Sequence, residues 1–254
     1  MILMRWPGLA FLLTAVLLSS PARASDPSDA SFLRRVYTNS AGSRLPYRVM
    51  RVGTPTPATM VPLIVFLHGA IARGEDNQEP LNWGPRLIRD SLQKSNQCAL
   101  IVVPQCPRAV GWFSAGGRGP DALKLTVELI DSTLVREFQV DPRRRYLTGV
   151  SMGGIGLWSY LSEHPGYFAA AVPVCAAGTP SRVTPAAARF PVWAFHSDDD
   201  HLIPVQSARD MVQAWKAKGG VALYTEYTGL KHSSWKKAYL EADLYHWLFA
   251  QKLP

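Results

Sequence analysis

The stretch Tyr146–Leu161, YLTGVSMGGIGLWSYL, decides the expected fold. Its first residues have the continuous apolar character of a buried strand, and its last residues have the pattern of a helix. Between them lies Ser151, with Gly149 and Gly153 two residues away on either side. A helix start capped by serine has a use for only one of these glycines. A sharp strand-to-helix turn that lifts the serine hydroxyl above a sheet needs both, because side chains at the flanks would clash. The stretch therefore predicts a nucleophile at Ser151.

Apolar and helix-like segments alternate along the rest of the chain, which has 254 residues and is 47% hydrophobic. Continuous apolar runs suit parallel strands that are covered on both faces. Alternation of strands and helices predicts an α/β fold: one domain with a mostly parallel central sheet and helices on both faces. The expected strands are 47–53, antiparallel, and 61–69, 98–105, 145–150, 168–175, 190–197 and 221–229, and the expected helices are 83–93, 121–138, 153–163, 205–218 and 236–251.

Functional groups of such a sheet gather at the carboxyl ends of the strands. One predicted strand ends at His68-Gly69-Ala70. A glycine there lets the backbone approach Ser151, so that the N–H groups of Ala70 and Met152 can bind a developing oxyanion together. His68 is expected to be a structural hydrogen-bonding residue rather than the base, because it precedes the serine in the chain.

The ends of two later strands carry the candidates for an acid and a base. Asp198, Asp199 and Asp200 follow one strand, and a solvated acidic turn would account for at least two of them. His232 follows the last strand and is the histidine that combines a late position, a loop and a strand end. We expect His232 to be the base, oriented by one of the aspartates.

The chain resembles the α/β-hydrolase superfamily in the stretches FLHGAIARGEDN, VVPQCP, YLTGVSMGGIGLW, FHSDDDHLIPV and YTGLKHSSW. More narrowly, it resembles the phospholipase/carboxylesterase and predicted-peptidase branch, which includes feruloyl-esterase-like and polyhydroxybutyrate-depolymerase-like enzymes. These stretches extend over nearly the whole chain after its first residues. The order of a triad of Ser151, an aspartate and His232 is the order of that superfamily.

The resemblance also implies roles for individual residues. The family pattern F-H-G-x-x-D-x-x-V-P, aligned on His196 and Pro204, places the acid on Asp200, with Asp198 the second choice; Ser197 stands where the family has glycine. In the first loop, the family's H-G-A-G-E-R-G is replaced by HGAIARG, so the rim of that loop is expected to differ. By the same resemblance, Gln105 and Trp112 would lie near the substrate pocket.

The implied activity is hydrolysis of carboxylic esters through an acyl-enzyme on Ser151, with His232 and Asp200 completing the triad. Neither a metal nor an organic cofactor is implied. The expected substrate is a small or oligomeric ester. Two alternatives remain open: a serine peptidase of the same fold, and a binding protein that kept the fold but lost catalysis.

The first residues predict export. Arg5 is followed by the apolar run 9–18 and then by Ala22-Arg23-Ala24, a small-x-small cleavage site. This order is typical of a secretory signal peptide, here 1–24, which would leave a mature domain 25–254 in the periplasm or outside the cell. The apolar run is too short for a spanning helix, so no stable membrane insertion is expected after cleavage.

Charge and cysteines add weaker constraints. The formal net charge is +8, but the basic residues are scattered, and the short run 143–145 is expected in a solvated loop before a strand. The sequence contains no long basic stripe with interleaved aromatic residues, so nucleic-acid binding is not predicted. Cys98 and Cys106 lie at the two ends of one expected strand, about 26 Å apart at about 3.3 Å per residue, which is too far for a disulfide. With Cys175 the count is odd, and no metal-ligand spacing appears.

Overall fold

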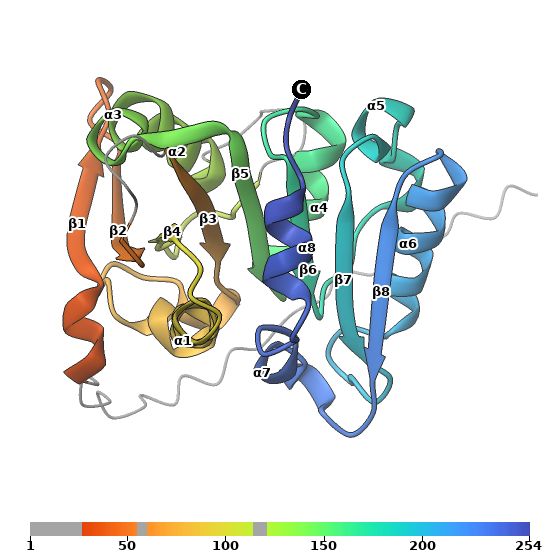
Figure 1. The fold of residues 1–254 in the computed structure, drawn as a ribbon. Coiled ribbons are helices and arrows are strands. Elements are labelled where there is room, and N and C mark those ends of the chain that lie inside the picture. Colours follow the sequence, from red (N-terminus) through yellow and green to blue (C-terminus); the bar gives the residue numbers. More distant parts are fainter. Residues whose placement is uncertain (1–26, 55–59, 114–120) are drawn as a thin grey trace, which may run out of the picture.

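An eight-stranded sheet forms the centre of the molecule (Figure 1). The structure is a computed structural model that describes residues 27–54, 60–113 and 121–254. The signal peptide predicted for 1–24 lies outside the described residues. The spatial order of the strands is β1-β2-β4-β3-β5-β6-β7-β8. Their bounds are β1 Leu33–Thr38, β2 Arg44–Val52, β3 Val61–Leu67, β4 Ala99–Pro104, β5 Val140–Val150, β6 Ala170–Val174, β7 Val192–Ser197 and β8 Ala222–Tyr227.

The sheet is mostly parallel, as predicted. β2 pairs antiparallel with both β1 and β4. The remaining pairs, in the spatial order β4-β3-β5-β6-β7-β8, are all parallel. β1 was not predicted, because its residues are all exposed or half-buried and so carry no continuous apolar signal. It forms one edge of the sheet, where a strand needs only one covered side.

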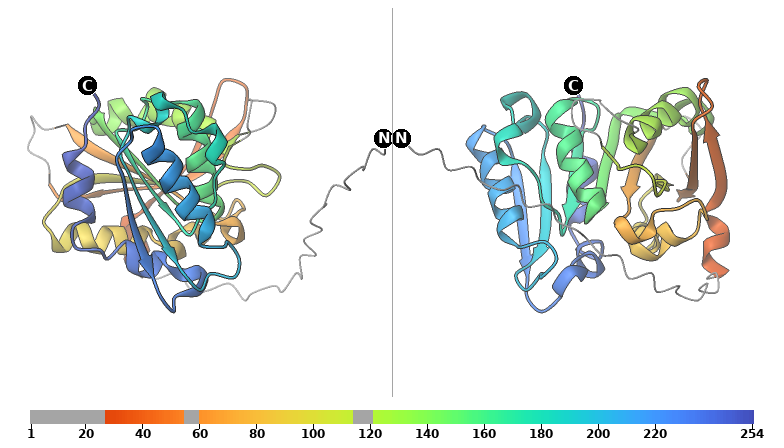
Figure 2. Two further views of the ribbon diagram at one scale, coloured as in Figure 1. Left: turned by 90° about the vertical axis from the view of Figure 1, so that its right-hand side faces the viewer. Right: turned by 180° about the vertical axis from the view of Figure 1, so that it is seen from behind.

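Helices cover both faces of the sheet (Figure 2). Helices α1 and α8 lie on one face, and α2, α4, α5 and α6 lie on the other. The bounds are α1 Pro85–Lys94, α2 Ala122–Leu129, α3 Val135–Phe138, α4 Met152–Glu163, α5 Pro185–Ala188, α6 Gln206–Ala217, α7 Trp235–Ala238 and α8 Leu244–Ala250. None of the helices within the described residues is long and apolar enough to span a membrane.

Each face of the sheet has its own hydrophobic core. Trp158 of α4 and Trp215 of α6 belong to one cluster, with ring centroids 5.3 Å apart. Ile88 of α1 and Leu248 of α8 belong to the other. Strands β3, β4 and β6 are buried along their whole length, because successive side chains enter the two cores alternately. A sheet covered on both sides in this way exposes only its edges and strand ends to a ligand.

The expected helix 236–251 is wrong as one element, because the chain breaks between α7 and α8. At the break, the carbonyl of Tyr239 accepts hydrogen bonds from the Ser91 hydroxyl and the Tyr245 hydroxyl, both at 2.9 Å. The Tyr239 carbonyl is therefore bound by side-chain hydroxyls rather than by the backbone N–H groups of a continuous helix. The expected helix 121–138 is continuous but changes winding, with a π-helical segment Ile130–Leu134 between α2 and α3.

The basic run 143–145 is also not a solvated loop, because β5 begins at Val140 and includes it. Arg143 donates to the Leu253 carbonyl at 2.8 Å, and Arg144 pairs with Asp141 at 2.6 Å. Long arginine side chains can reach acceptors beyond the strand while their backbone stays extended. The strand that leads to Ser151 is therefore longer than its apolar part.

Candidate active site

Ser151 stands on the sharp turn between β5 and α4. Its backbone has φ +55° and ψ −119°, a conformation that costs a non-glycine residue free energy and persists only where the surroundings impose it. A Cβ on Gly149 would lie 2.5 Å from the carbonyl carbon of Gly153, and a Cβ on Gly153 would overlap the Leu67 carbonyl. The two glycines therefore allow β3, β5 and α4 to meet closely enough to hold the serine in this strained position.

The structure brings Ser151, His232 and Asp200 together into one chain of hydrogen bonds. The hydroxyl oxygen of Ser151 lies 2.9 Å from Nε2 of His232, and Nδ1 of His232 lies 2.7 Å from Oδ2 of Asp200. Ser151 follows β5, His232 follows β8 and Asp200 follows β7. The carboxyl ends of these parallel strands lie on the same side of the sheet. The serine hydroxyl can donate to Nε2 because the carboxylate holds the imidazole proton on Nδ1.

The Asp200 side chain is fully buried, at 0% exposure. Its other oxygen, Oδ1, accepts the backbone N–H groups of Leu202 at 2.9 Å and Ile203 at 3.0 Å. A buried carboxylate needs such donors to offset its lost hydration. Both oxygens are thus engaged, and the orientation of the carboxylate toward His232 is defined from two sides.

The other two aspartates were expected in a solvated turn, but they bind the loop that carries His232. Asp198 accepts from the Thr228 hydroxyl at 3.0 Å, and Asp199 accepts from the Lys231 backbone N–H at 2.9 Å. The Ser197 hydroxyl donates to Asp199 at 2.6 Å, and this bond is the largest cause of the lowered pKa of Asp199. These side chains join the β7 and β8 loops and so set the position of the histidine.

The backbone after β3 approaches the serine closely. A Cβ on Gly69 would lie 3.5 Å from Cβ of Ser151 and 4.0 Å from its hydroxyl oxygen. The next N–H group is that of Ala70, and the N–H of Met152 begins α4. Neither N–H has a hydrogen-bond acceptor among the described residues. Both donors are therefore free to bind a ligand atom next to Ser151.

His68 orients the peptide that carries the Ala70 N–H. Its Nε2 accepts the Cys106 backbone N–H at 3.0 Å, so its proton lies on Nδ1 and is donated to the Gly69 carbonyl at 2.7 Å. The Gly69 carbonyl and the Ala70 N–H belong to one planar peptide unit and point in opposite directions. Burial lowers the pKa of His68 to about 4, so the ring is neutral at pH 7.

Several solved structures that resemble this one are esterases and peptidases. A thermostable esterase matches with a TM-score of 0.79 and 33% identity, over 88% of this chain and 64% of that one. A ferulic acid esterase matches with a TM-score of 0.66 and 19% identity, over 86% of this chain and 97% of that one. The acylaminoacyl peptidase of Pyrococcus horikoshii matches with a TM-score of 0.64 and 16% identity, over 88% and 42%.

The chain has the α/β-hydrolase fold. It spans less than two thirds of the thermostable esterase, 64% of its length, and less than half of the peptidase. No protein-family model matches the chain, and no curated protein matches its sequence. The resemblance expected from the sequence motifs is confirmed by these structural neighbours.

Gln105 and Trp112 were expected near the substrate pocket, but both side chains are fully buried. Gln105 donates to the Ala72 carbonyl at 3.0 Å and accepts the Asn77 N–H at 2.6 Å. Trp112 donates its indole N–H to the His68 carbonyl at 2.8 Å. Because neither reaches solvent, neither can line an open pocket. They instead hold the loop between β3 and α1 that carries Ala70.

Cys175 lies beneath the site, at the end of β6. It is fully buried, and its φ of +41° is unusual for a residue with a side chain. Burial raises the pKa of its thiol to about 12, so it is protonated at neutral pH and does not compete with Ser151 as a nucleophile. Cys98, Cys106 and Cys175 are all free. In the ranges that the structure describes, no three His, Cys, Asp or Glu side chains are placed to hold a metal ion.

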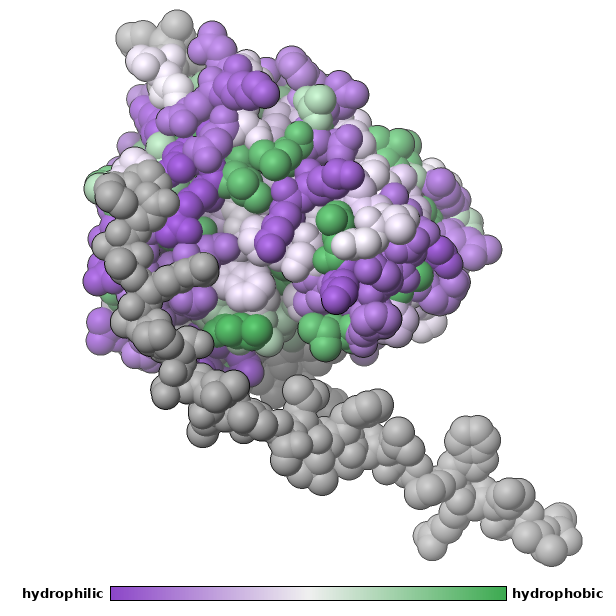
Figure 3. Space-filling model, turned by 90° about the horizontal axis from the view of Figure 1, so that it is seen from below, coloured by the Kyte–Doolittle hydropathy of each residue, from purple (hydrophilic) through white to green (hydrophobic). Residues whose placement is uncertain are grey.

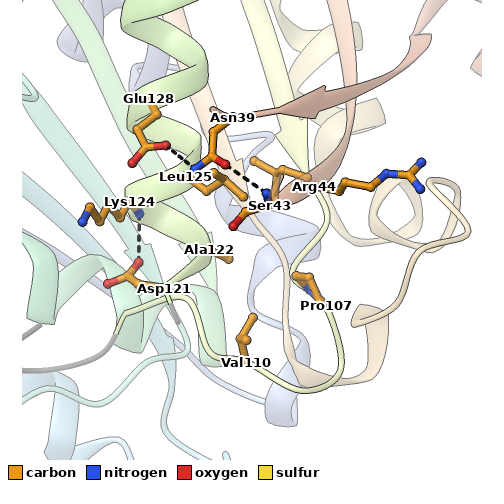
Figure 4. A pocket seen from close by; sticks show the side chains of 11 residues that line it. Asn39, Ser43, Arg44, Pro107, Val110, Asp121, Ala122, Lys124, Leu125 and Glu128 are labelled. Carbon is orange, nitrogen blue, oxygen red and sulfur yellow. Dashed lines mark hydrogen bonds between the residues drawn. The ribbon is translucent and has the colours of Figure 1, made fainter. Parts of the chain in front are cut away.

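A hollow elsewhere on the protein is separate from Ser151, His232 and Asp200 (Figure 4). It lies between the β1–β2 turn, the loop after β4 and helix α2. Its polar groups bind one another: Asn39 donates to Glu128 at 3.0 Å, and the Lys124 N–H donates to Asp121 at 2.8 Å. Ser151, His232 and Asp200 do not line it, so the hydrogen-bonded site at Ser151 remains the candidate active site.

Proposed function

We propose that this protein is an exported serine hydrolase that cleaves carboxylic esters. The observation that carries the proposal is the continuous chain from the Ser151 hydroxyl through His232 to Asp200, with separations of 2.9 and 2.7 Å. Such a chain makes a serine nucleophilic at neutral pH, because the imidazole takes up its proton during attack. The esterases among the structural neighbours support the same chemistry.

The reaction follows from the positions of the groups. Nε2 of His232 accepts the Ser151 proton while the serine oxygen attacks the ester carbonyl, and Asp200 stabilises the resulting imidazolium. The Ala70 and Met152 N–H groups bind the oxygen that becomes negative. The imidazolium then protonates the leaving alcohol, and water, activated by the same histidine, releases the acid from the acyl-enzyme. Each oxyanion donor is expected to contribute about 10²–10³ in rate.

The surface around the site supports a substrate with an apolar part. Seen from the carboxyl ends of the parallel strands, hydrophilic side chains surround separate apolar patches (Figure 3). Ile71, next to Ala70, is 74% exposed, and Leu202, two residues after Asp200, is also 74% exposed. Each lies on a loop that forms the site, so each is available to contact an acyl or aryl group bound at Ser151.

A panel of p-nitrophenyl esters of increasing chain length, with methyl ferulate added, tests the proposal. The wild type should turn over at least one ester, and Ser151→Ala should lower kcat by about 10³-fold or more without changing the thermal unfolding midpoint. A fluorophosphonate probe should label the wild type and not the variant. Full activity in Ser151→Ala would refute the assignment of the nucleophile.

The same panel distinguishes two other functions. The acylaminoacyl peptidase among the structural neighbours favours a test of a dipeptide p-nitroanilide against the ester of the same acyl group. A peptidase must also protonate a poor amine leaving group, so we expect the ester to be cleaved faster. A binding protein that has lost catalysis would neither hydrolyse the esters nor react with the fluorophosphonate.

Export is a separate part of the proposal and rests on the N-terminal sequence alone. Expression of the full chain in a bacterial host should give a secreted or periplasmic protein that begins at Ser25. Intact-mass measurement of the protein from each fraction tests this. Recovery of the uncleaved chain from the cytoplasm would contradict it.

A further inference from the structure

A buried histidine, His196, contacts the same carboxylate oxygen of Asp200 as His232 does. His196 is the fifth residue of β7, and its side chain is fully buried. Its Nε2 lies 2.9 Å from the Ile203 carbonyl and 3.2 Å from Oδ2 of Asp200. Oδ2 is the same oxygen that binds His232. The imidazoles of His196 and His232 therefore share one oxygen of the Asp200 carboxylate.

The partners of His196 decide its protonation state. Both atoms near Nε2 are acceptors, so Nε2 carries the ring proton and points it mainly at the Ile203 carbonyl. Nδ1 is buried and has no hydrogen-bond partner among the residues described. A second proton there would leave a charged ring with an unpaired N–H in the core. Burial accordingly lowers the pKa of His196, and the ring is a neutral donor.

The Glu226 carboxylate near His196 is paired with another side chain and does not accept the His196 N–H. Glu226 is the cross-strand neighbour of His196 on β8. The Glu226 carboxylate is held by Arg209 of α6 through two contacts of 2.9 and 2.5 Å. Asp200, which also binds His232, is therefore the carboxylate that the His196 N–H contacts, at 3.2 Å.

We propose that His196 is a positioning residue for the triad acid, an inference that rests on the proposed function. Its N–H ties the Ile203 carbonyl to the end of β7 and so closes the turn that follows the strand. Within that turn, the Leu202 and Ile203 N–H groups bind Oδ1 of Asp200. The same N–H lies against Oδ2. One neutral side chain thus fixes both oxygens of the carboxylate in the orientation that His232 requires.

Two amide variants give a matched test. In His196→Gln, the side-chain nitrogen can occupy the place of Nε2 and donate to Ile203. In His196→Asn, which is polar and neutral too, the nitrogen reaches only the place of Nδ1 and cannot make that bond. His196→Leu fills the space without any donor and serves if the Asn variant does not fold, as judged by circular dichroism and thermal unfolding.

The readout is kcat and KM for the best p-nitrophenyl ester of the wild type. Asn and Leu should lower kcat by about 10- to 100-fold with KM within about twofold, since the substrate does not touch His196 and misplaced catalytic groups slow the chemical step. Gln should restore kcat to within about threefold of the wild type. In an Asp200→Asn background, the His196 variants should cause no further loss, because their effect acts through the carboxylate.

Equal kcat in folded Asn, Leu and Gln variants and the wild type would overturn the inference, as would equal losses in Gln and Asn. A loss that persists in the Asp200→Asn background would overturn it too. Failure of the proposed function has a different signature: the wild type would not hydrolyse any ester and would not react with the fluorophosphonate.

Discussion

Mild acid should destabilise the folded protein through His68. The folded protein keeps this ring neutral, because burial lowers its pKa to about 4. The lone pair of its Nε2 is occupied by the Cys106 N–H. The unfolded chain takes up the same proton near the ordinary pKa of 6.5. Between these values the unfolded state binds more protons than the folded state, so the free energy of unfolding falls as the pH falls.

The size of the effect follows from the two pKa values. If His68 were fully protonated in the unfolded chain and neutral in the folded protein, the free energy of unfolding would fall by about 3 kcal/mol. Each pKa unit corresponds to about 1.4 kcal/mol. Between pH 7 and pH 5 the loss should be about 2 kcal/mol. The pKa of His196 is lowered as well, which adds to the loss in the same direction. The lowered carboxyl pKa values of Asp76 and Asp141 act mainly at more acidic pH.

Urea unfolding at pH 7, 6 and 5 measures this, with His68→Gln as the matched control. Glutamine can offer one donor and one acceptor in place of the two ring nitrogens, but it does not titrate. The variant should be less stable than the wild type at pH 7 and should lose about 2 kcal/mol less than the wild type on going to pH 5. The same pH dependence in both proteins would refute the assignment of a neutral, buried His68.

Three further outcomes are expected. Gly153→Ala should prevent the close approach of α4 to the Leu67 carbonyl and destabilise the protein by about 3 kcal/mol or more, measured by thermal unfolding; a stable, active variant would contradict the tight turn. Asp200→Asn should lower kcat by about 10⁴-fold, whereas Asp198→Asn should change it less than about tenfold, and equal effects would show that the acid is misassigned. Ile71→Ser should raise KM for p-nitrophenyl hexanoate by about threefold and leave the acetate unchanged; parallel changes for both esters would exclude a contact with the acyl chain.

Most of the fold could be predicted from the sequence because its signals are local. The runs 61–69, 98–105 and 168–175 are continuous apolar segments, and they became strands buried on both faces. Where the local signal was weak or misleading, the prediction failed. β1 lies at an edge of the sheet, and neither of its faces is fully apolar. The basic run 143–145 was expected in a solvated loop, but its side chains bind acceptors beyond the strand.

The site residues divide in the same way. The glycines around Ser151 mark a strained turn that local geometry alone requires, and His232 follows from its place after the last strand. The local sequence could not distinguish Asp198, Asp199 and Asp200, since neighbours in a loop share one local pattern. Asp200 was selected by the resemblance to the α/β-hydrolase pattern. In the structure the choice depends on which carboxylate faces His232 at 2.7 Å.

Sequence alone determined that a parallel sheet with a serine on a strand-to-helix turn would form, because periodicity and glycine placement act over a few residues. The tertiary structure alone decided what surrounds that serine. Gln105 and Trp112 hold a loop instead of lining a pocket, and His196 contacts Asp200 from within β7. Such contacts depend on the directions of side chains that meet only when distant strands align, and no local pattern encodes those directions.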